Sequence, residues 1–367
     1  MDISKRDSSL DVIRIFATFC VVSVHFFANN GFYVEPVNDY RMFLPIMVRT
    51  FFMVCVPLFI VLTGYLMCKK TLSGKYYKGI TKTLVIYLLV SLVTIVYKHN
   101  VINDLYDVKR SILAILNFEA ATYSWYIEMY IGLFLMIPFL NLAYNGLTTK
   151  RHKQILILTF IGLTVLPAFS NSFCFNVEDW WLQPSVSAEY NQLIPNWWCG
   201  IYPLAYYFIG CYIREFGIKI NKIINTLIIL ITLTLATGYI YYRSFGNVFV
   251  YAAWNEWAGL FTLILTTLVF TIILGTKWIN NLPPKAKACI KYLSELTLGA
   301  YLISYIFDNY FYTKLNTAVP VFYDKQPYFF IIVPLVFICS MLASAVINLF
   351  YSAALIIIDS IRKASGK

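Results

Sequence analysis

The first long apolar stretch of the sequence is Ser9-Leu10-Asp11-Val12-Ile13-Arg14-Ile15-Phe16-Ala17-Thr18-Phe19-Cys20-Val21-Val22-Ser23-Val24-His25-Phe26-Phe27. It is long enough to cross a bilayer, yet it carries an arginine and a histidine. A helix turns roughly 100° per residue, so the eleven steps from Arg14 to His25 bring both side chains to one face, about 16 Å apart along the axis. Asp11 and Thr18 share that face. Ionisable groups at membrane depth are costly and normally mark function.

The composition predicts an integral membrane protein. The 367 residues are 60% hydrophobic and only 13% charged, and the mean hydropathy is +0.68. Soluble domains carry about 25% charged residues. Apolar runs of about 20 residues are typical of membrane helices, whereas barrel strands alternate in hydrophobicity. We therefore expect an all-α, polytopic transmembrane helical bundle, forming a single domain over residues 1–367.

The order of apolar and basic segments predicts a topology. About ten spans are expected, at 10–28, 43–67, 83–97, 124–142, 155–170, 201–213, 223–242, 257–274, 292–311 and 329–358. Most of the 29 lysines and arginines fall on alternate loops, as the positive-inside rule requires. We therefore attribute the net charge of +11 to membrane topology, and we expect no nucleic-acid partner. Lys5, Arg6 and Lys367 place both termini in the cytoplasm.

This topology assigns a depth to each ionisable residue within a span. His25 and Asp308 come late in outward-going spans, while Arg49 and Glu128 come early in inward-going ones, so these four share the outer third of the membrane. Arg14 lies near the inner face. Histidine suits the role of a general base because its unperturbed pKa is about 6.5, and Glu128 or Asp308 is placed to orient it.

Each of these five residues also has a structural interpretation. The Arg14 side chain can snorkel to the inner surface, and Arg49 can lock helices through an ion pair. Glu128 and Asp308 can be interfacial, and His25 can be a structural histidine.

Several kinds of site are missing from the sequence. It contains no nucleophile elbow, no metal-spaced Cys/His cluster and no glycine-rich phosphate loop, so we expect no metal. Of the eight cysteines most lie in apolar spans, and the pairing of Cys174 with Cys199 stays open. Seven of the eight tryptophans lie toward the outer side, which favours an aromatic surface that can stack on sugar rings.

Several motifs in order resemble the acyltransferase-3 family of integral membrane acyltransferases. The first span has the family's Arg and His separated by ten residues, preceded by Leu-Asp. Further matches are Val56-Pro57-Leu58-Phe59 with Thr63-Gly64-Tyr65-Leu66, Trp125-Tyr126-Ile127, Tyr207-Phe208-Ile209-Gly210 and Leu298-Gly299-Ala300-Tyr301. The chain departs from the family at Ser304 and at Thr122-Tyr123-Ser124, where many members have a histidine.

The resemblance implies transfer of an acyl group, commonly acetyl from cytoplasmic acetyl-CoA, to hydroxyls of cell-surface glycans, lipids or other acceptors. By motif, His25 is the catalytic residue, and we add Glu128 to it. The expected donor-binding residues are Arg14, Arg49, Lys69, Lys70 and Lys82. The acceptor side of the cavity is expected to include Trp125, Tyr126, Tyr301, Ser304 and Asp308.

We therefore expect an O-acetyltransferase of a bacterial plasma membrane, acting on a cell-surface or lipid-linked glycan. Direct transfer and an acyl-histidine intermediate are both open. The alternatives are an exporter of a glycan or lipid-linked precursor, which would use the same polar cavity without making a bond, and a membrane sensor module. The acceptor, the acyl chain and the oligomeric state are not specified by the sequence.

Overall fold

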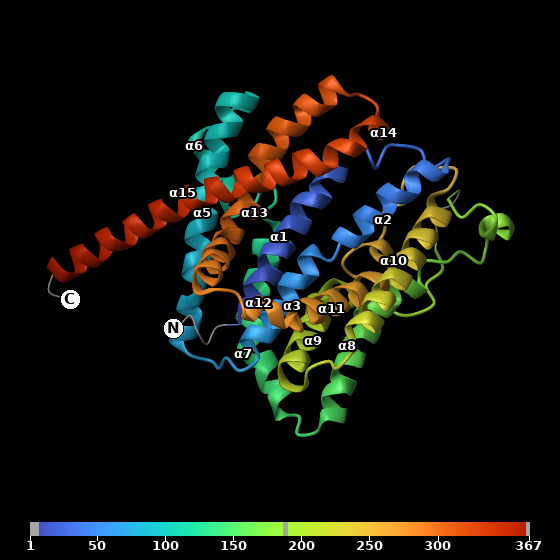
Figure 1. Cartoon of the computed structure of the whole chain (residues 1–367), viewed down its shortest axis with the longest axis horizontal. Helices are drawn as coiled ribbons and strands as arrows, with labels where there is room; N and C mark the ends of the chain where they lie inside the picture. The colour runs from blue at the N-terminus through green and yellow to red at the C-terminus, as the bar shows by residue number, and fades with distance from the viewer. Residues whose placement is uncertain (1–6, 186–189, 365–367) are drawn as a thin grey trace.

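The computed structural model describes residues 7–185 and 190–364 and is built of helices (Figure 1). The α-helices of the described chain are α1 Ser8–Asn29, α2 Phe43–Phe52, α3 Cys55–Met67, α4 Gly74–Tyr77, α5 Thr81–Tyr97, α6 Val108–Leu116, α7 Trp125–Gly146, α8 Lys150–Ser170, α9 Pro203–Phe216, α10 Lys222–Ser244, α11 Leu260–Leu274, α12 Lys277–Asn280, α13 Pro284–Ala318, α14 Phe322–Lys325 and α15 Phe329–Ala364. The all-helical fold expected from the sequence is confirmed.

Eight segments of the described chain are long and apolar enough to cross a membrane, so the protein is an integral multi-pass membrane protein. They are Ser8–Asn29, Tyr40–Met67, Gly74–Ile102, Trp125–Gly146, Lys150–Ser170, Lys222–Ser244, Ala253–Leu274 and Phe322–Leu355. The other two expected spans are helices of a different character. Helix α9 has only 14 residues, and the 35 residues of α13 include lysines and a polar stripe. Lys5, Arg6 and Lys367, on which the predicted side of the termini depends, lie outside the described residues.

The second span is broken into two helices, α2 and α3, at Met53 and Val54. Pro57 explains the break, because it has no N–H to donate and its ring clashes with the carbonyl group four residues earlier, that of Met53. The α3 segment can therefore take a direction of its own against α1 and α9.

Helix α7 contains a proline, Pro138, yet continues through it. The proline leaves the carbonyl oxygen of Phe134 without its usual helical donor. The hydroxyl of Tyr76 donates to that oxygen at 2.6 Å, and the Tyr76 ring stacks on the Phe134 ring at 4.4 Å. The α4 segment thus supplies the hydrogen-bond donor that α7 lacks at its proline, and it holds α7 beside the loop that follows α3.

Helices α3 and α9 approach each other closely enough to require glycine. A Cβ atom on Gly64 would lie 2.0 Å from the carbonyl oxygen of Tyr207, and one on Gly210 would lie 2.1 Å from that of Val61. Small residues at both crossing points let the two backbones touch, as is common between membrane helices.

Helix α1 lies in the middle of the bundle and contacts α2, α3, α11, α13 and α15 (Figure 1). Its partner α13 is covered on another side by α15. All eight cysteines, including Cys174 and Cys199, are free thiols. Because α1 is surrounded by helices, its polar face meets protein instead of lipid.

Candidate active site

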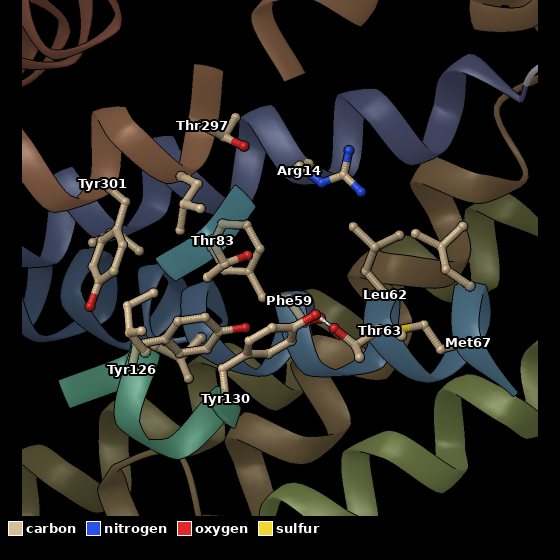
Figure 2. A pocket seen from close by; sticks show the side chains of 15 residues that line it. Arg14, Phe59, Leu62, Thr63, Met67, Thr83, Tyr126, Tyr130, Thr297 and Tyr301 are labelled. Atoms are coloured by element: carbon tan, nitrogen blue, oxygen red, sulfur yellow. Dashed lines mark hydrogen bonds between the residues drawn. The ribbon is translucent and has the colours of Figure 1, made fainter. Parts of the chain in front are cut away.

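Arg14 marks the first half of the site, near the N-terminal end of α1. Its guanidinium Nη1 donates to Ser294 Oγ on α13 at 2.8 Å and lies 3.6 Å from the carboxylate of Asp11. The side chain is 28% exposed and extends into a cavity between α1, α3, α5, α7 and α13 (Figure 2). A positive charge therefore faces an internal space that is otherwise mostly apolar.

The cavity has a volume of about 290 Å³. It is lined by Arg14, Val21, Val56, Phe59, Leu62, Thr63, Leu66, Met67, Thr83, Tyr126, Ile127, Tyr130, Thr297, Leu298 and Tyr301. The rings of Tyr126 and Tyr130 lie side by side, 6.1 Å apart and nearly parallel, and Figure 2 shows both hydroxyls pointing the same way, toward Thr63. An elongated molecule with a negative group at one end and amide or carbonyl oxygens along its length fits this lining.

His25 and Asp308 form the second half of the site. The imidazole Nδ1 lies 2.8 Å from Asp308 Oδ2, and the carboxylate is fully buried. An ionised carboxylate can only accept hydrogen bonds, so Nδ1 carries the proton and donates it. The other ring nitrogen, Nε2, then presents its lone pair. This is the arrangement that a neutral histidine needs to act as a base.

The pairing follows from how α1 and α13 lie. The two helices run in the same direction, and Arg14 meets Ser294 at one level while His25 meets Asp308 further along both helices. The interval is 11 residues on α1 and 14 on α13, so the contacts are spaced similarly along two parallel helices. The two polar stripes seen in the sequence therefore face each other.

Tyr123 completes the group around His25. Its hydroxyl donates to Asp308 Oδ2 at 2.9 Å, and its ring lies over the imidazole with centroids 3.8 Å apart. Sequence reasoning noted this position only as a departure from the family pattern. Tyr123 precedes α7, so helical periodicity could not predict its place in the site.

The cavity ends one helical turn short of His25. Val21, four residues before His25, lines it, together with Tyr126 and Tyr301, whereas His25 itself does not. The Tyr301 hydroxyl donates to the backbone carbonyl oxygen of Tyr123. The wall between the Arg14 cavity and the His25 group is thus made of tyrosines joined to each other.

The expected donor-binding cations lie in three different places. Arg49 is fully buried and donates to the Tyr33 hydroxyl at 3.2 Å and to the carbonyl oxygen of Asn255 at 2.6 Å. It fastens α2 to two connecting segments and lies away from the cavity lining. Lys69 and Lys70 are exposed just after α3, and Lys82 is exposed in the first turn of α5. Their near neighbours in the chain, Leu66, Met67 and Thr83, line the cavity, whereas the lysines themselves do not.

The remaining expected residues are also scattered. Glu128 is exposed on α7, and the carboxylate beside the imidazole of His25 is that of Asp308. Trp125 stacks on Trp257 at 4.5 Å. The Ser304 hydroxyl donates to the Tyr301 carbonyl oxygen within its own helix at 2.8 Å. Of the expected acceptor residues, Tyr126 and Tyr301 line the cavity, and Asp308 lies at His25.

The sequence reasoning also missed residues that line the cavity, among them Thr63, Thr83 and Tyr130. Tyr130 follows Tyr126 by one helical turn, and that spacing was available as a signal. Among the residues that the structure describes, no three His, Cys, Asp or Glu side chains gather into a metal site.

Comparison with known proteins identifies the family. The model of the acyltransferase domain of the acyltransferase-3 family matches residues 7–347, a range that includes Arg14, His25, Tyr123 and Asp308. No curated protein and no solved structure matches the chain. The chain therefore belongs to the acyltransferase-3 family and is an integral multi-pass membrane acyltransferase.

Proposed function

We propose that the protein is a bacterial plasma-membrane O-acetyltransferase that moves acetyl from cytoplasmic acetyl-CoA to a hydroxyl of a cell-surface or lipid-linked glycan. The observation that carries the proposal is the hydrogen bond between His25 Nδ1 and Asp308 Oδ2. It leaves Nε2 available as a general base at the outer end of the helix whose inner end carries Arg14.

The proposed reaction needs one base and two bound partners. His25 Nε2 removes the proton from the acceptor hydroxyl as the oxygen attacks the thioester carbonyl carbon. A carbon–oxygen bond forms, the carbon–sulfur bond breaks, and the imidazolium returns the proton to the departing thiolate. Asp308 stabilises the transient imidazolium through a charge-assisted hydrogen bond. Holding both partners in place supplies much of the acceleration.

The donor is proposed to enter at the Arg14 level. The cavity of about 290 Å³ is too small for a whole coenzyme A molecule but has room for a pantetheine arm. Arg14 would bind a phosphate or carbonyl oxygen at its mouth, and the exposed Lys69, Lys70 and Lys82 would attract the nucleotide phosphates. Tyr126 and Tyr130 would donate to the amide oxygens of the arm.

Because the cavity stops at Tyr126 and Tyr301, the acetyl group must pass these side chains to reach His25. A small acyl group fits this constraint better than a long one. We therefore favour acetyl over fatty acyl donors.

The test compares surface glycans by mass spectrometry in a deletion strain complemented with wild type, with His25→Ala, or with His152→Ala. His152 is an exposed histidine at the start of α8, so its replacement controls for losing an imidazole. We expect the acetyl mass difference to return with wild type and His152→Ala but not with His25→Ala. Acetylation by His25→Ala would refute the assignment, and loss of the whole polymer from the deletion strain would favour export.

A further inference from the structure

Tyr123 lies at the junction between the Arg14 cavity and the His25 group. It lies outside α1 and α13, the two helices that carry His25 and Asp308, and it precedes the start of α7 at Trp125 by two residues. Its backbone accepts a hydrogen bond from Tyr301, a residue of the cavity wall. Its side chain contacts both His25 and Asp308.

The hydroxyl of Tyr123 shares one carboxylate oxygen with His25. Asp308 Oδ2 accepts from the tyrosine hydroxyl at 2.9 Å and from the imidazole Nδ1 at 2.8 Å. The other oxygen, Oδ1, is buried and has no hydrogen-bond partner. Two donors on the same oxygen therefore set the orientation of the carboxylate, and neither bond alone would fix it.

The ring of Tyr123 fixes the imidazole from a second direction. The two ring planes are 30° apart with centroids at 3.8 Å, a stacking contact over the face of the histidine. Tyr305 supports the tyrosine edge-on at 5.9 Å. The Asp308 carboxylate thus holds the imidazole through a hydrogen bond at its edge, and the Tyr123 ring contacts its face.

The backbone around Tyr123 is anchored as well. The next residue, Ser124, is fully buried, and its hydroxyl donates to the carbonyl oxygen of Ala121 at 2.6 Å. Together with the bond from Tyr301, this holds the tyrosine ahead of α7. A side chain fixed at its base and bonded at its tip is suited to positioning another group.

We propose that Tyr123 is a positioning residue for acyl transfer, holding the Asp308 carboxylate and the His25 ring in the reactive arrangement. The inference rests on the proposed role of His25 as the base. Tyr123 acts through the other two residues and takes no part in bond making.

Because Tyr123 and His25 share one carboxylate oxygen, removing the tyrosine hydroxyl should change the pH dependence of the reaction in a predictable direction. The tyrosine hydroxyl withdraws part of the negative charge of Asp308, and without it that charge acts more strongly on a protonated imidazole. His25 would then keep its proton to a higher pH. Removing the hydroxyl should shift the acidic limb of the pH–rate profile upward by about half a pH unit or more.

The other charged and titratable groups near this arrangement are few. Tyr312, one turn beyond Asp308 on α13, is buried and has no hydrogen-bond partner. Lys98, at the end of the span that contains α5, lies 5.2 Å from the centroid of the Tyr305 ring. Arg49 on α2 is bonded elsewhere, and Arg14 on α1 is three turns away.

The test compares Tyr123→Phe with Tyr97→Phe in the full-length protein. Tyr97 is a matched control, because its hydroxyl donates at 2.9 Å to Asn309, the residue next to Asp308. The chain has 3 histidines, so ¹⁵N-histidine NMR can follow each one, and the His25 signals are those lost in His25→Gln. Titration of these signals is recorded alongside the pH–rate profile of acetyl transfer from labelled acetyl-CoA.

We expect Tyr123→Phe to raise the midpoint of the His25 titration and of the acidic limb together, with KM for acetyl-CoA unchanged, while Tyr97→Phe changes neither. An unchanged midpoint in Tyr123→Phe, or an equal shift in Tyr97→Phe, would overturn the proposal. If Tyr123→Phe does not fold, 3-fluorotyrosine at this position, a stronger donor, should move the midpoint downward, and an upward move or none would contradict us. Acetyl transfer by His25→Gln would instead overturn the proposed function, and the NMR titration would still decide the role of Tyr123.

Discussion

Replacing Asp308 with asparagine removes the charge beside His25 while keeping the shape of the side chain. The amide oxygen can take the place of Oδ2 and accept from His25 and Tyr123, as the carboxylate does at 2.8 and 2.9 Å. The amide nitrogen then takes the place of Oδ1, which has no hydrogen-bond partner. Asp308→Asn therefore tests the charge with little loss of geometry.

The size of the effect follows from the separation and the burial. For unit charges about 4 Å apart at an effective dielectric constant of about 20, Coulomb's law gives about 4 kcal/mol. In the proposed reaction, that energy stabilises the imidazolium form of His25 in the transition state and not the neutral ring of the resting enzyme. At a factor of ten per 1.36 kcal/mol, we expect kcat to fall by about 10²- to 10³-fold.

The assay is transfer of labelled acetyl from acetyl-CoA to the membrane acceptor fraction, with KM for the donor measured in the same series. Because the Arg14 cavity does not include Asp308, KM should change little. Asp324→Asn is the control, since it makes the same chemical change at an exposed acid on α14. Thermal unfolding of both variants separates a loss of chemistry from a loss of folded protein.

The refuting result is specific. If purified, folded Asp308→Asn keeps kcat within about threefold of wild type, the charge of Asp308 contributes little to the reaction. The histidine would then have to act without its partner or not act at all. A large rise in KM with kcat unchanged would instead place Asp308 in binding.

Three further changes test the donor cavity and the fold. Arg14→Gln should raise KM for acetyl-CoA about tenfold or more with a smaller change in kcat, as expected for loss of a charged contact to the donor. Gly64→Ala should lower the free energy of unfolding by about 1–3 kcal/mol, because the new Cβ would lie 2.0 Å from a backbone oxygen of α9. Gly132→Ala is the control, since its new Cβ would meet nothing within 4 Å, and it should not lower the free energy of unfolding in the same series. Tyr76→Phe should lower the unfolding free energy by about 1 kcal/mol, measured in parallel, because it leaves the proline-freed carbonyl of α7 without a donor.

The positions of the spans follow from the sequence, because a bilayer requires long apolar helices and their order is written in the chain. The stripe through Arg14 and His25 also follows, since it depends only on helical geometry. The partner of His25 does not follow. Glu128 and Asp308 share the expected depth, and the choice between them depends on how α7 and α13 are rotated about their axes.

Residues outside regular helices were beyond reach for a different reason. Tyr123 is placed by the turn ahead of α7 and by its bond from Tyr301, and neither contact has a sequence period. Arg49 lies within α2, and the sequence placed it among the donor-binding cations without fixing its partners. Its neighbours are instead a phenol and the backbone oxygen of Asn255, contributed by segments more than a hundred residues apart.

The partnership of His25 with Asp308 has a consequence for how the protein is made. The two residues are 283 positions apart, and chains are synthesised at about 5–20 residues per second. The first helix therefore waits for about 15 to 60 seconds before its partner leaves the ribosome. During that interval the histidine has to be accommodated by water, lipid headgroups or an insertion factor. Chains that stop before α13 can insert most of their helices and still lack the pair, so acetyl transfer would report on completed biogenesis as well as on chemistry.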